Sequence, residues 1–431
     1  MEKNSKRKLL VCGDSLNQTT GFSYVISSIV KHLIATDQYE ICYATITGSD
    51  TTPDGLSAQG AEFAEAAQNI QLTNVQVNDK AKARHIDKVM EQFAPEIVLT
   101  SHDPWYVDTI AYSPYRDSFY WAAYMTVEVP EYPAFVMSPS PILPTNRKPI
   151  RDIMSRASVV IPHTKMGYDM FTKHWELDNV SEFCYSGVDF DQRCTEEVSK
   201  SEAFGESVSE DDFIFMTMGF NSERKKIDRV IESFYRFKQK HKNPKYKLYI
   251  HTDVNAQTGG TDLRTLVGEL GLMDDILIPT SYQAGVGIDK KDLYRRYQAS
   301  DCYIGLPSGE GFGYGFAEAM MHGKPLIYIN YGGHTCYCKP AGLGVKVNDF
   351  VHARYAYMKW ALADMDDAAK QMGRMVSDQR FRDSAAKKGF EIARDQLDWK
   401  VTFPKWHDAM LSRYNPNEIS KLAGVPMRRI V

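Results

Sequence analysis

The chain has 431 residues, of which 43% are hydrophobic and 25% charged, and its formal net charge at pH 7 is −4. This length is enough for two domains with substantial cores, and the composition is that of a soluble globular protein and not of a disordered one. A slightly acidic chain has no overall attraction to nucleic acid or to an anionic membrane, so any such contact must come from a local patch.

The chain shows no sign of a membrane span or a secretion signal. Its longest apolar runs, such as Ser158–Pro162, have the length of a strand, and Met1–Lys8 leads into a strand without the apolar core of a signal peptide. The seven cysteines are scattered, and their odd number favours reduced thiols in a reducing compartment. These features predict a cytoplasmic protein without an integral membrane segment.

The first half of the sequence alternates short apolar runs with helical patterns. Leu9–Cys12 is a candidate strand, and apolar residues from Phe22 to Leu33 recur at helical spacing after a loop that contains Gly21. Further candidate strands lie at 39–46, 97–100, 119–125 and 159–161. This alternation predicts a parallel sheet with crossover helices, and hence a Rossmann-like domain over residues 1–205.

A second alternation begins after a polar, charge-rich stretch at residues 199–212. Its candidate elements are a strand at 213–218, a helix at 227–240, a strand at 247–251, a helix at 262–270 and a strand at 276–279. The pattern predicts a second Rossmann-like domain over residues 206–398, with long helices from 351 to 397, and a final segment, 399–431, that starts with a helix. The predicted fold class is therefore α/β, with two doubly wound domains.

The most informative stretch is Pro307–Glu318, which places two glutamates and four glycines between an apolar strand and a helix. Its glycines let backbone N–H groups approach an anion, and the N-terminus of the following helix directs its positive dipole to the same place. Glu310 and Glu318 can then accept hydrogen bonds from ligand hydroxyls in one cleft. The stretch predicts a site for a polyhydroxyl ligand that carries phosphate; the alternative is a loop that only turns a strand into a helix.

This stretch resembles the signature of family-4 retaining glycosyltransferases, in which two glutamates flank a Gly-Phe-Gly core with seven residues between them. The flanking sequences resemble the same family: a strand ending in Pro307-Ser308 precedes the stretch, and a Gly323-Lys-Pro325 turn, a strand and Gly332-Gly333 follow it. The resemblance covers most of the second half of the chain and is to the glycogen synthase and phosphatidylinositol mannosyltransferase-like group. It implies the GT-B fold, in which two Rossmann-like domains face each other across a cleft and a C-terminal helix crosses back onto the first domain.

The resemblance also implies an activity: a retaining, metal-independent transfer of a sugar from a nucleoside-diphosphate sugar, of the UDP or GDP type, to an acceptor hydroxyl. It assigns Glu310 to the transferred sugar, Glu318 to the ribose, and Arg224 and Lys225 to the donor diphosphate. Fixed cations beside a departing diphosphate would lower the barrier, although an Arg-Lys-Lys run at a helix start is otherwise a solvated surface feature. The nucleotide sugar is a co-substrate, so neither a cofactor nor a metal is expected.

Other donor-side candidates follow from the same resemblance. Gly21 lies before the first helix, where the family keeps glycines close to the sugar and phosphates; a helix-capping loop, with Thr20 or Ser23 as the cap, is the alternative. The remaining donor-side candidates are Asn221, Gln283, Gly311, Phe312, Gly313 and Tyr314.

The short cluster of His334, Cys336 and Cys338 lacks a second pair at zinc-site spacing, which favours an ordinary loop over a metal site.

Segments that follow predicted strands of the first half supply the acceptor-side candidates. His102, Asp103 and Trp105 follow one strand, and Trp105 is expected to be an exposed aromatic that stacks on a sugar or base; capping of the next segment is the alternative. Glu128 follows the next strand, where relatives often have a His, and is either an acceptor contact or a turn residue. His163 follows a later strand and is expected to lie behind the residues that touch the ligand.

The kind of acceptor is the least determined feature of the sequence. Family members modify glycans, lipids, metabolites and, in some viral enzymes, hydroxymethylated DNA bases. Aromatic residues after Tyr106 could stack on an extruded DNA base, although core packing explains the same residues. A non-catalytic subunit that binds a sugar nucleotide is a further alternative. The aromatic residues in question are Tyr112, Tyr115, Tyr120, Trp121, Tyr132 and Phe135.

Overall fold

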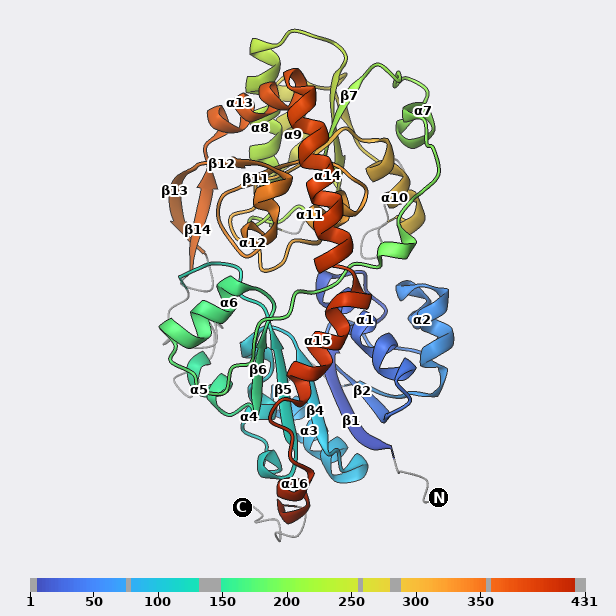
Figure 1. Ribbon diagram of the computed structural model, residues 1–431, viewed down its shortest axis with the longest axis vertical. Coiled ribbons are helices and arrows are strands. Elements are labelled where there is room, and N and C mark those ends of the chain that lie inside the picture. Colours follow the sequence, from blue (N-terminus) through green and yellow to red (C-terminus); the bar gives the residue numbers. More distant parts are fainter. Residues whose placement is uncertain are drawn as a thin grey trace.

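The computed structural model describes residues 6–74, 79–131, 149–254, 259–279, 288–353 and 358–422. Two α/β domains are stacked along the long axis of the molecule (Figure 1). The N-terminal part of the chain forms the lower domain in this view, the middle part forms the upper one, and the C-terminal end returns to the lower domain. The predicted α/β class with two doubly wound domains is confirmed.

The first domain is built on a six-stranded parallel sheet with the strand order β3-β2-β1-β4-β5-β6. Its strands are β1 (Arg7–Asp14), β2 (Tyr39–Thr47), β3 (Gln71–Asn74), β4 (Ile97–Ser101), β5 (Tyr120–Met125) and β6 (Val159–Pro162). β4, β5 and β6 are buried along their whole length, because helices cover both faces of a parallel sheet. The order reverses at β1, and ligands of such sheets bind beyond the carboxyl ends of the strands near this point.

Short helices connect these strands. They are α1 (Gly21–Ala35), η1 (Asp54–Gln59), α2 (Ala61–Ala66), η2 (Ala67–Asn69), α3 (Asp79–Phe93), η3 (Pro104–Tyr106), α4 (Asp108–Ala111), η4 (Arg116–Ser118), α5 (Ile150–Ser155), α6 (Lys165–Asp169) and η5 (Met170–His174). The apolar spacing that predicted α1 buries Val25, Ile26, Ile29 and Leu33 against one face of the sheet.

The second domain repeats the architecture with the order β12-β11-β10-β7-β8-β9. Its strands are β7 (Phe213–Met218), β8 (Tyr246–His251), β9 (Ile276–Leu277), β10 (Cys302–Gly305), β11 (Leu326–Ile329) and β12 (Gly342–Val345). Its helices, with the connecting turn before them, are η6 (Phe190–Gln192), α7 (Lys200–Phe204), α8 (Ile227–Lys240), α9 (Leu263–Glu269), α10 (Lys290–Ala299), α11 (Tyr314–Met321), α12 (Thr335–Cys338), η7 (Lys339–Ala341), α13 (Met365–Ser377) and α14 (Gln379–Gln396).

The prediction that long helices begin at residue 351 is wrong. β13 (Val347–His352) and β14 (Lys359–Ala363) pair as an antiparallel hairpin, and the helices α13 and α14 begin only at Met365. The burial of β14 alternates as in a strand, since Ala361 and Ala363 are buried while Trp360 and Leu362 are only partly buried.

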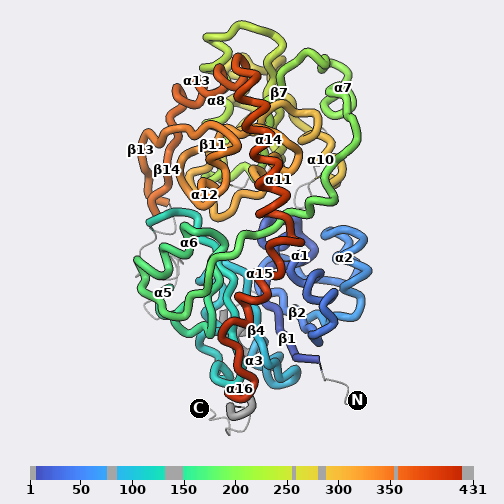
Figure 2. Tube along the Cα trace, viewed as in Figure 1, coloured from blue at the N-terminus to red at the C-terminus, as the bar shows by residue number. Residues whose placement is uncertain are grey.

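The C-terminal helix α15 (Trp399–Leu411) crosses back onto the first domain, as the resemblance implied. Figure 2 shows this red segment running down from the second domain to the first, and the short α16 (Pro416–Leu422) follows it. Trp399 and Trp406 are fully buried in the core of the first domain. Where α15 begins, the chain pairs with the outgoing connection, because Val188 N donates to Leu397 O at 2.7 Å and Trp399 N to Val188 O at 3.1 Å. No helix in the described ranges is both long and apolar enough to cross a membrane.

Candidate functional site between the domains

A cleft of about 1470 Å³ lies between the two domains and is lined by both of them. The carboxyl ends of the first sheet contribute Asp14, Thr47, His102, Thr126, Glu128 and His163. The second domain contributes Lys225, Glu310 and Glu318 from segments that follow β7 and β10. The cavity is large for a single small ligand, and it has room for two substrates side by side.

Glu310 lies at the centre of the cleft and is paired with two cations. Its Oε2 lies 2.6 Å from Lys225 Nζ and 3.2 Å from Arg224 Nη1. Burial on its own would raise the pKa of Glu310, but Lys225 and Arg224 outweigh burial and lower the pKa to about 2. Glu310 is therefore a carboxylate at any pH near neutrality.

The cationic pair is positioned by the turn between β7 and α8. Gly219 has φ +147, a conformation that favours glycine, and a Cβ there would lie 3.3 Å from the Lys225 side chain. Lys226 is the N-cap residue of α8, with φ 50, and does not line the cleft. Of the three consecutive cations, only Arg224 and Lys225 reach the site.

Arg224 connects the two domains. Its Nε lies 3.0 Å from Glu128 Oε1 of the first domain, and its Nη1 donates to Gly309 O at 2.8 Å as well as to Glu310. Burial would lower the pKa of Arg224, but the carboxylates of Glu128 and Glu310 raise it. Burial raises the pKa of Glu128 despite the opposing effect of Arg224. The turn interpretation of Glu128 is thus incomplete, since its side chain faces the cleft.

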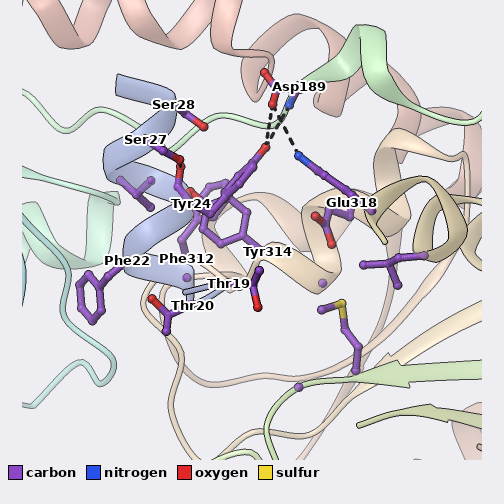
Figure 3. Close-up of a pocket in the computed structure, with 18 of the residues that line it drawn as sticks. Thr19, Thr20, Phe22, Tyr24, Ser27, Ser28, Asp189, Phe312, Tyr314 and Glu318 are labelled. Carbon is purple, nitrogen blue, oxygen red and sulfur yellow. Dashed lines mark hydrogen bonds and ion pairs between the residues drawn. The ribbon is translucent and has the colours of Figure 1, made fainter. Parts of the chain in front are cut away.

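Glu318 lies on α11, and its surroundings differ from those of Glu310. It is 7% exposed, and its Oε2 accepts a hydrogen bond from Tyr297 at 3.2 Å. Burial raises the pKa of Glu318 to about 7, although Lys290 and the tyrosine hydroxyls lower it. Tyr24, Glu318 and Tyr314 lie around one part of the cleft in Figure 3.

The glycines of the signature do not all serve one purpose. A Cβ at Gly309 would lie 2.8 Å from Val129, and one at Gly311 would lie 1.8 Å from Thr126 Oγ1, so these two permit close contact with the first domain. Gly313 is the N-cap of α11, with φ +90 and no side-chain cap. The backbone N–H groups predicted to approach an anion are therefore those at the start of α11. Gly309 and Gly311 instead allow the two domains to approach each other closely.

Phe312 and Tyr314 line the cleft in different ways. The Phe312 side chain is buried and packs near Tyr337, with ring centroids 5.2 Å apart, so mainly its backbone is available to a ligand. The Tyr314 ring lies edge-on to Tyr24 of α1, with centroids 4.8 Å apart.

A contact between Tyr24, Asp189 and Lys290 closes one end of the cleft and was not anticipated from the sequence. The Tyr24 hydroxyl donates to Asp189 Oδ2 at 3.4 Å, and Lys290 Nζ lies 3.6 Å from the same oxygen and 4.2 Å from the centre of the Tyr24 ring. Figure 3 shows Tyr24 pointing toward Asp189. The three residues come from α1, the connection between the domains and α10, so no local pattern links them.

The Gly21 loop caps α1, and it also lines the cleft. The Thr20 hydroxyl caps α1 by accepting a hydrogen bond from Ser23 N at 3.0 Å, and Gly21 itself is exposed and lines the cleft. The neighbouring Asp14 was not anticipated as a site residue: its carboxylate accepts hydrogen bonds from Thr20 at 2.6 Å and Thr47 at 2.9 Å. An Asp at the carboxyl end of an apolar strand was the signal that could have identified it.

His102 and Asp103 follow β4, and of the two only His102 lines the cleft. His102 is buried and stacked on Phe22 with centroids 4.6 Å apart, and its Nε2 lies 2.8 Å from Thr47 Oγ1. Burial, together with Glu128, raises the pKa of Asp103 to about 8. Asp103 N donates to His102 Nδ1 at 2.8 Å, so the neutral His102 carries its proton on Nε2.

The expectation of an exposed Trp105 is wrong. Trp105 is partly buried and packs against the core of the first domain, whereas Tyr106 is 38% exposed and lines the cleft. The 3₁₀ turn η3 starts at Pro104 and turns the second of the two adjacent aromatic side chains, not the first, toward the ligand space.

His163 lies closer to the ligand space than expected. It lines the cleft, stacks on Tyr124 with centroids 3.8 Å apart, and its Nδ1 lies 3.1 Å from Ser186 Oγ. Burial lowers the pKa of His163 to about 3, so the ring is neutral. Among the described residues its buried Nε2 has no hydrogen-bond partner.

Comparisons with known proteins bear on the family of the second domain and on the fold of the chain. Residues 199–379 match the family profile described as glycosyl transferases group 1. Over these residues the chain is similar to group 1 glycosyltransferases. No curated protein sequence matches the chain at a significant level.

Solved structures extend the likeness to the whole chain. HepE of Anabaena, in complex with UDP and glucose, has a TM-score of 0.67 at 14% identity and covers 94% of this chain and 100% of its own. A glycosyltransferase of Rickettsia africae has a TM-score of 0.67 at 14% identity, over 95% and 99% of the two chains. Sucrose-phosphate synthase of Thermosynechococcus elongatus has 0.68 at 14% identity, over 94% and 98%. These likenesses show the GT-B fold.

Two donor-side candidates of the second domain, Asn221 and Gln283, are not among the described residues that line the cleft. Asn221 is buried and donates to Thr261 O at 2.7 Å, so its amide holds a neighbouring loop. It does not line the cleft. Gln283 lies outside the described residues.

Two further sequence features have ordinary structural roles. His334 is buried against Phe316, and within the described ranges no group of three or more potential metal ligands comes together. The aromatic residues proposed as a stacking surface for DNA pack into or against the first-domain core: these are Tyr112, Tyr115, Tyr120 and Trp121. Tyr132 and Phe135 lie outside the described residues.

Proposed function

We propose that the protein is a retaining glycosyltransferase that moves a sugar from a nucleoside-diphosphate sugar, of the UDP or GDP type, to an acceptor hydroxyl without a metal ion. The observation that supports this most strongly is the cluster of Glu310, Lys225 and Arg224 next to the uncapped start of α11. It combines a carboxylate for sugar hydroxyls with fixed positive charge for a diphosphate.

The cations supply the charge stabilisation that other transferases obtain from a metal. As the bond between the sugar C1 and the diphosphate oxygen breaks, negative charge grows on the leaving diphosphate, and Lys225, Arg224 and the N-terminus of α11 stabilise it. The acceptor hydroxyl forms its bond to C1 on the face that the diphosphate leaves, and its proton passes to a diphosphate oxygen. Glu310 orients the sugar hydroxyls and Glu318 the ribose.

A glycosidase is a less suitable function for the same carboxylates. It needs one ionised and one protonated carboxyl group beside the scissile bond, and Glu310 and Glu318 have such pKa values at slightly acid pH. However, an ordinary glycoside has no anionic leaving group, so the cationic pair on Glu310 would have no purpose. A nucleotide sugar accounts for the acids and the cations together.

The acceptor enters from the first domain. His102, Tyr106 and His163 line that wall and offer an aromatic face and neutral polar atoms to a hydroxylated molecule. A glycan, a lipid headgroup and a small metabolite all have suitable hydroxyls.

Donor turnover tests the proposal directly. The protein is incubated with a panel of UDP and GDP sugars, and slow release of free sugar is expected for one donor, whereas a non-catalytic binding subunit releases none. Added EDTA is expected to leave the rate unchanged, and NMR of the transfer product is expected to show the anomeric configuration of the donor. Strict dependence on a divalent ion, or inversion at C1, would contradict the proposal. Incubation with plain and hydroxymethylated DNA, read by nucleoside mass, tests a DNA acceptor.

A further inference from the structure

A short segment of the first domain, Thr126–Val129, contacts the glycine-rich loop of the second domain at Gly309–Gly311. Glu128 O accepts a hydrogen bond from Glu310 N at 2.9 Å, and the Cβ positions of Gly309 and Gly311 face Val129 and Thr126 at distances that only glycine permits. The backbone at Glu310 is thus hydrogen-bonded to the segment that follows β5 of the first domain.

The Glu128 side chain extends this contact to Arg224. Three acceptors hold the guanidinium. Glu128 Oε1 lies 3.0 Å from Nε, and Gly309 O and Glu310 Oε2 lie 2.8 and 3.2 Å from Nη1. Within the described part of the chain, Nη2 donates no hydrogen bond to protein. Since a guanidinium is planar and its donors form a rigid fork, fixing Nε and Nη1 also fixes the direction of Nη2.

We propose that Glu128 is a positioning residue, which orients Arg224 toward the donor diphosphate and does so only when the two domains are closed. This inference rests on the proposed function. Among the residues that the structure describes, Lys225 is paired with Glu310 alone, so an arriving diphosphate can draw it away and release Glu310 to the sugar hydroxyls. Arg224 keeps two of its three partners during this exchange, and Glu128 is the partner that comes from the first domain.

Donor hydrolysis separates this role from an acceptor contact. The Glu128→Gln variant keeps the size of the side chain and removes its charge. We expect kcat to fall about tenfold or more, both for sugar transfer and for hydrolysis of the donor without acceptor, with the acceptor KM unchanged within about twofold. Glu128→Asp, which keeps the charge, is expected to recover part of the loss in both reactions.

Glu131→Gln is the matched control. Glu131 is also a first-domain carboxylate that faces a cation of the second domain, Lys359 at 3.8 Å, but both side chains are largely exposed. This variant is expected to keep wild-type rates. If Glu128→Gln loses transfer but retains full hydrolysis, Glu128 is an acceptor contact and the inference is wrong; unchanged rates in both reactions also overturn it.

Small-angle X-ray scattering gives a readout that does not depend on activity. Glu128→Lys places a second cation against Arg224, and we expect a larger radius of gyration than in the wild type and in Glu131→Lys. If the wild type turns over no nucleotide sugar, the proposed function fails, while an expanded Glu128→Lys variant still supports the interdomain contact. An unchanged radius in Glu128→Lys would contradict the contact.

Discussion

The two glutamates of the signature have opposite electrostatic surroundings, although only seven residues separate them. Glu310 lies against Lys225 and Arg224, and its pKa is lowered to about 2. Glu318 is buried beside tyrosines, with Lys290 as the cation that influences it most, and its pKa is raised to about 7. The Glu310 end of the cleft is therefore charged at pH 7, whereas the carboxyl at the Glu318 end is only about half ionised there.

This difference shows how a single motif can hold a ligand with two chemically distinct ends. The Glu310 end has the paired charges that a diphosphate and the reacting sugar require. The Glu318 end offers hydrogen bonds in a low-polarity environment, which suits the hydroxyls of a ribose. The variants below test this contrast, starting with the largest expected effect.

Glu310→Gln removes the carboxylate at the charged end. We expect kcat/KM for transfer to fall about 100-fold to 1000-fold, because the sugar loses its anionic partner and the partly buried Lys225 and Arg224 lose the carboxylate that they share. Steady-state assays with the donor identified by the panel measure this. A melting temperature close to that of the wild type shows that the loss is not one of folding, and a variant with near-normal kcat/KM would remove Glu310 from the site.

Lys225→Met removes the cation that is free to follow the diphosphate. A fall in kcat of about 100-fold is expected, since a developing charge loses one fixed partner. Lys226→Asn serves as its control: the neighbouring cation does not line the cleft, and Asn tolerates the left-handed conformation found there. Equal losses in the two variants would mean that general surface charge, and not the site, is responsible.

Glu318→Gln tests the Glu318 end of the cleft through the pH dependence of ligand affinity. The wild-type carboxyl ionises as pH rises through about 7, so its hydrogen bonds from the ribose strengthen and nucleotide-sugar affinity should increase from pH 6 to pH 8. The variant should show no such rise, and it should bind about tenfold more weakly than the wild type at pH 8 but similarly at pH 6. Isothermal titration calorimetry at both pH values measures this; an equal difference at both would contradict the raised pKa.

Stability provides an independent check on Glu318. A carboxyl whose folded pKa lies above its unfolded value favours the folded state when protonated, so it lowers stability as pH rises from about 4.5 to about 7. Glu318→Gln removes this dependence. The melting temperature of the variant relative to the wild type should therefore be higher at pH 8 than at pH 5.

Tyr24→Phe is expected to have the smallest effect. It removes a hydroxyl whose hydrogen bond to Asp189 is long, at 3.4 Å, and leaves the ring on Lys290 and Tyr314. The donor KM should rise about twofold. A loss as large as that of Glu310→Gln would show that the Tyr24 contact, and not the charged end, controls the assembly of the site.

Much of the fold and part of the site could be predicted from the sequence because their signals are local. Apolar runs predicted most strands, the glycine-rich stretch placed Glu310 and Glu318 in one cleft, and the family resemblance added Lys225. The pairing of Arg224 with Glu128 could not be predicted, because the two residues come from different domains and no periodicity connects them. The same holds for Tyr24, Asp189 and Lys290.

Other differences arise from backbone details that composition does not reveal. Trp105 and Tyr106 are adjacent aromatic residues, and only the geometry of the turn after Pro104 decides which one faces the cleft. β13 and β14 form a hairpin that overlaps the start of the range 351–397, where helices were expected, because pairing between these strands outweighs the helical pattern of the residues that follow. Asn221 has the right residue type for a ligand contact, but its amide is used by the neighbouring loop.

The most direct test of the division of roles is the affinity of each variant for a nucleotide sugar and for the corresponding nucleoside diphosphate, measured by calorimetry at pH 8. Glu318→Gln should weaken both ligands by the same factor, because both contain the ribose. Glu310→Gln should weaken the nucleotide sugar relative to the nucleoside diphosphate, because only the former has the sugar. If Glu310→Gln weakens both ligands equally, or Glu318→Gln affects the nucleotide sugar alone, the assignment of the two glutamates is contradicted.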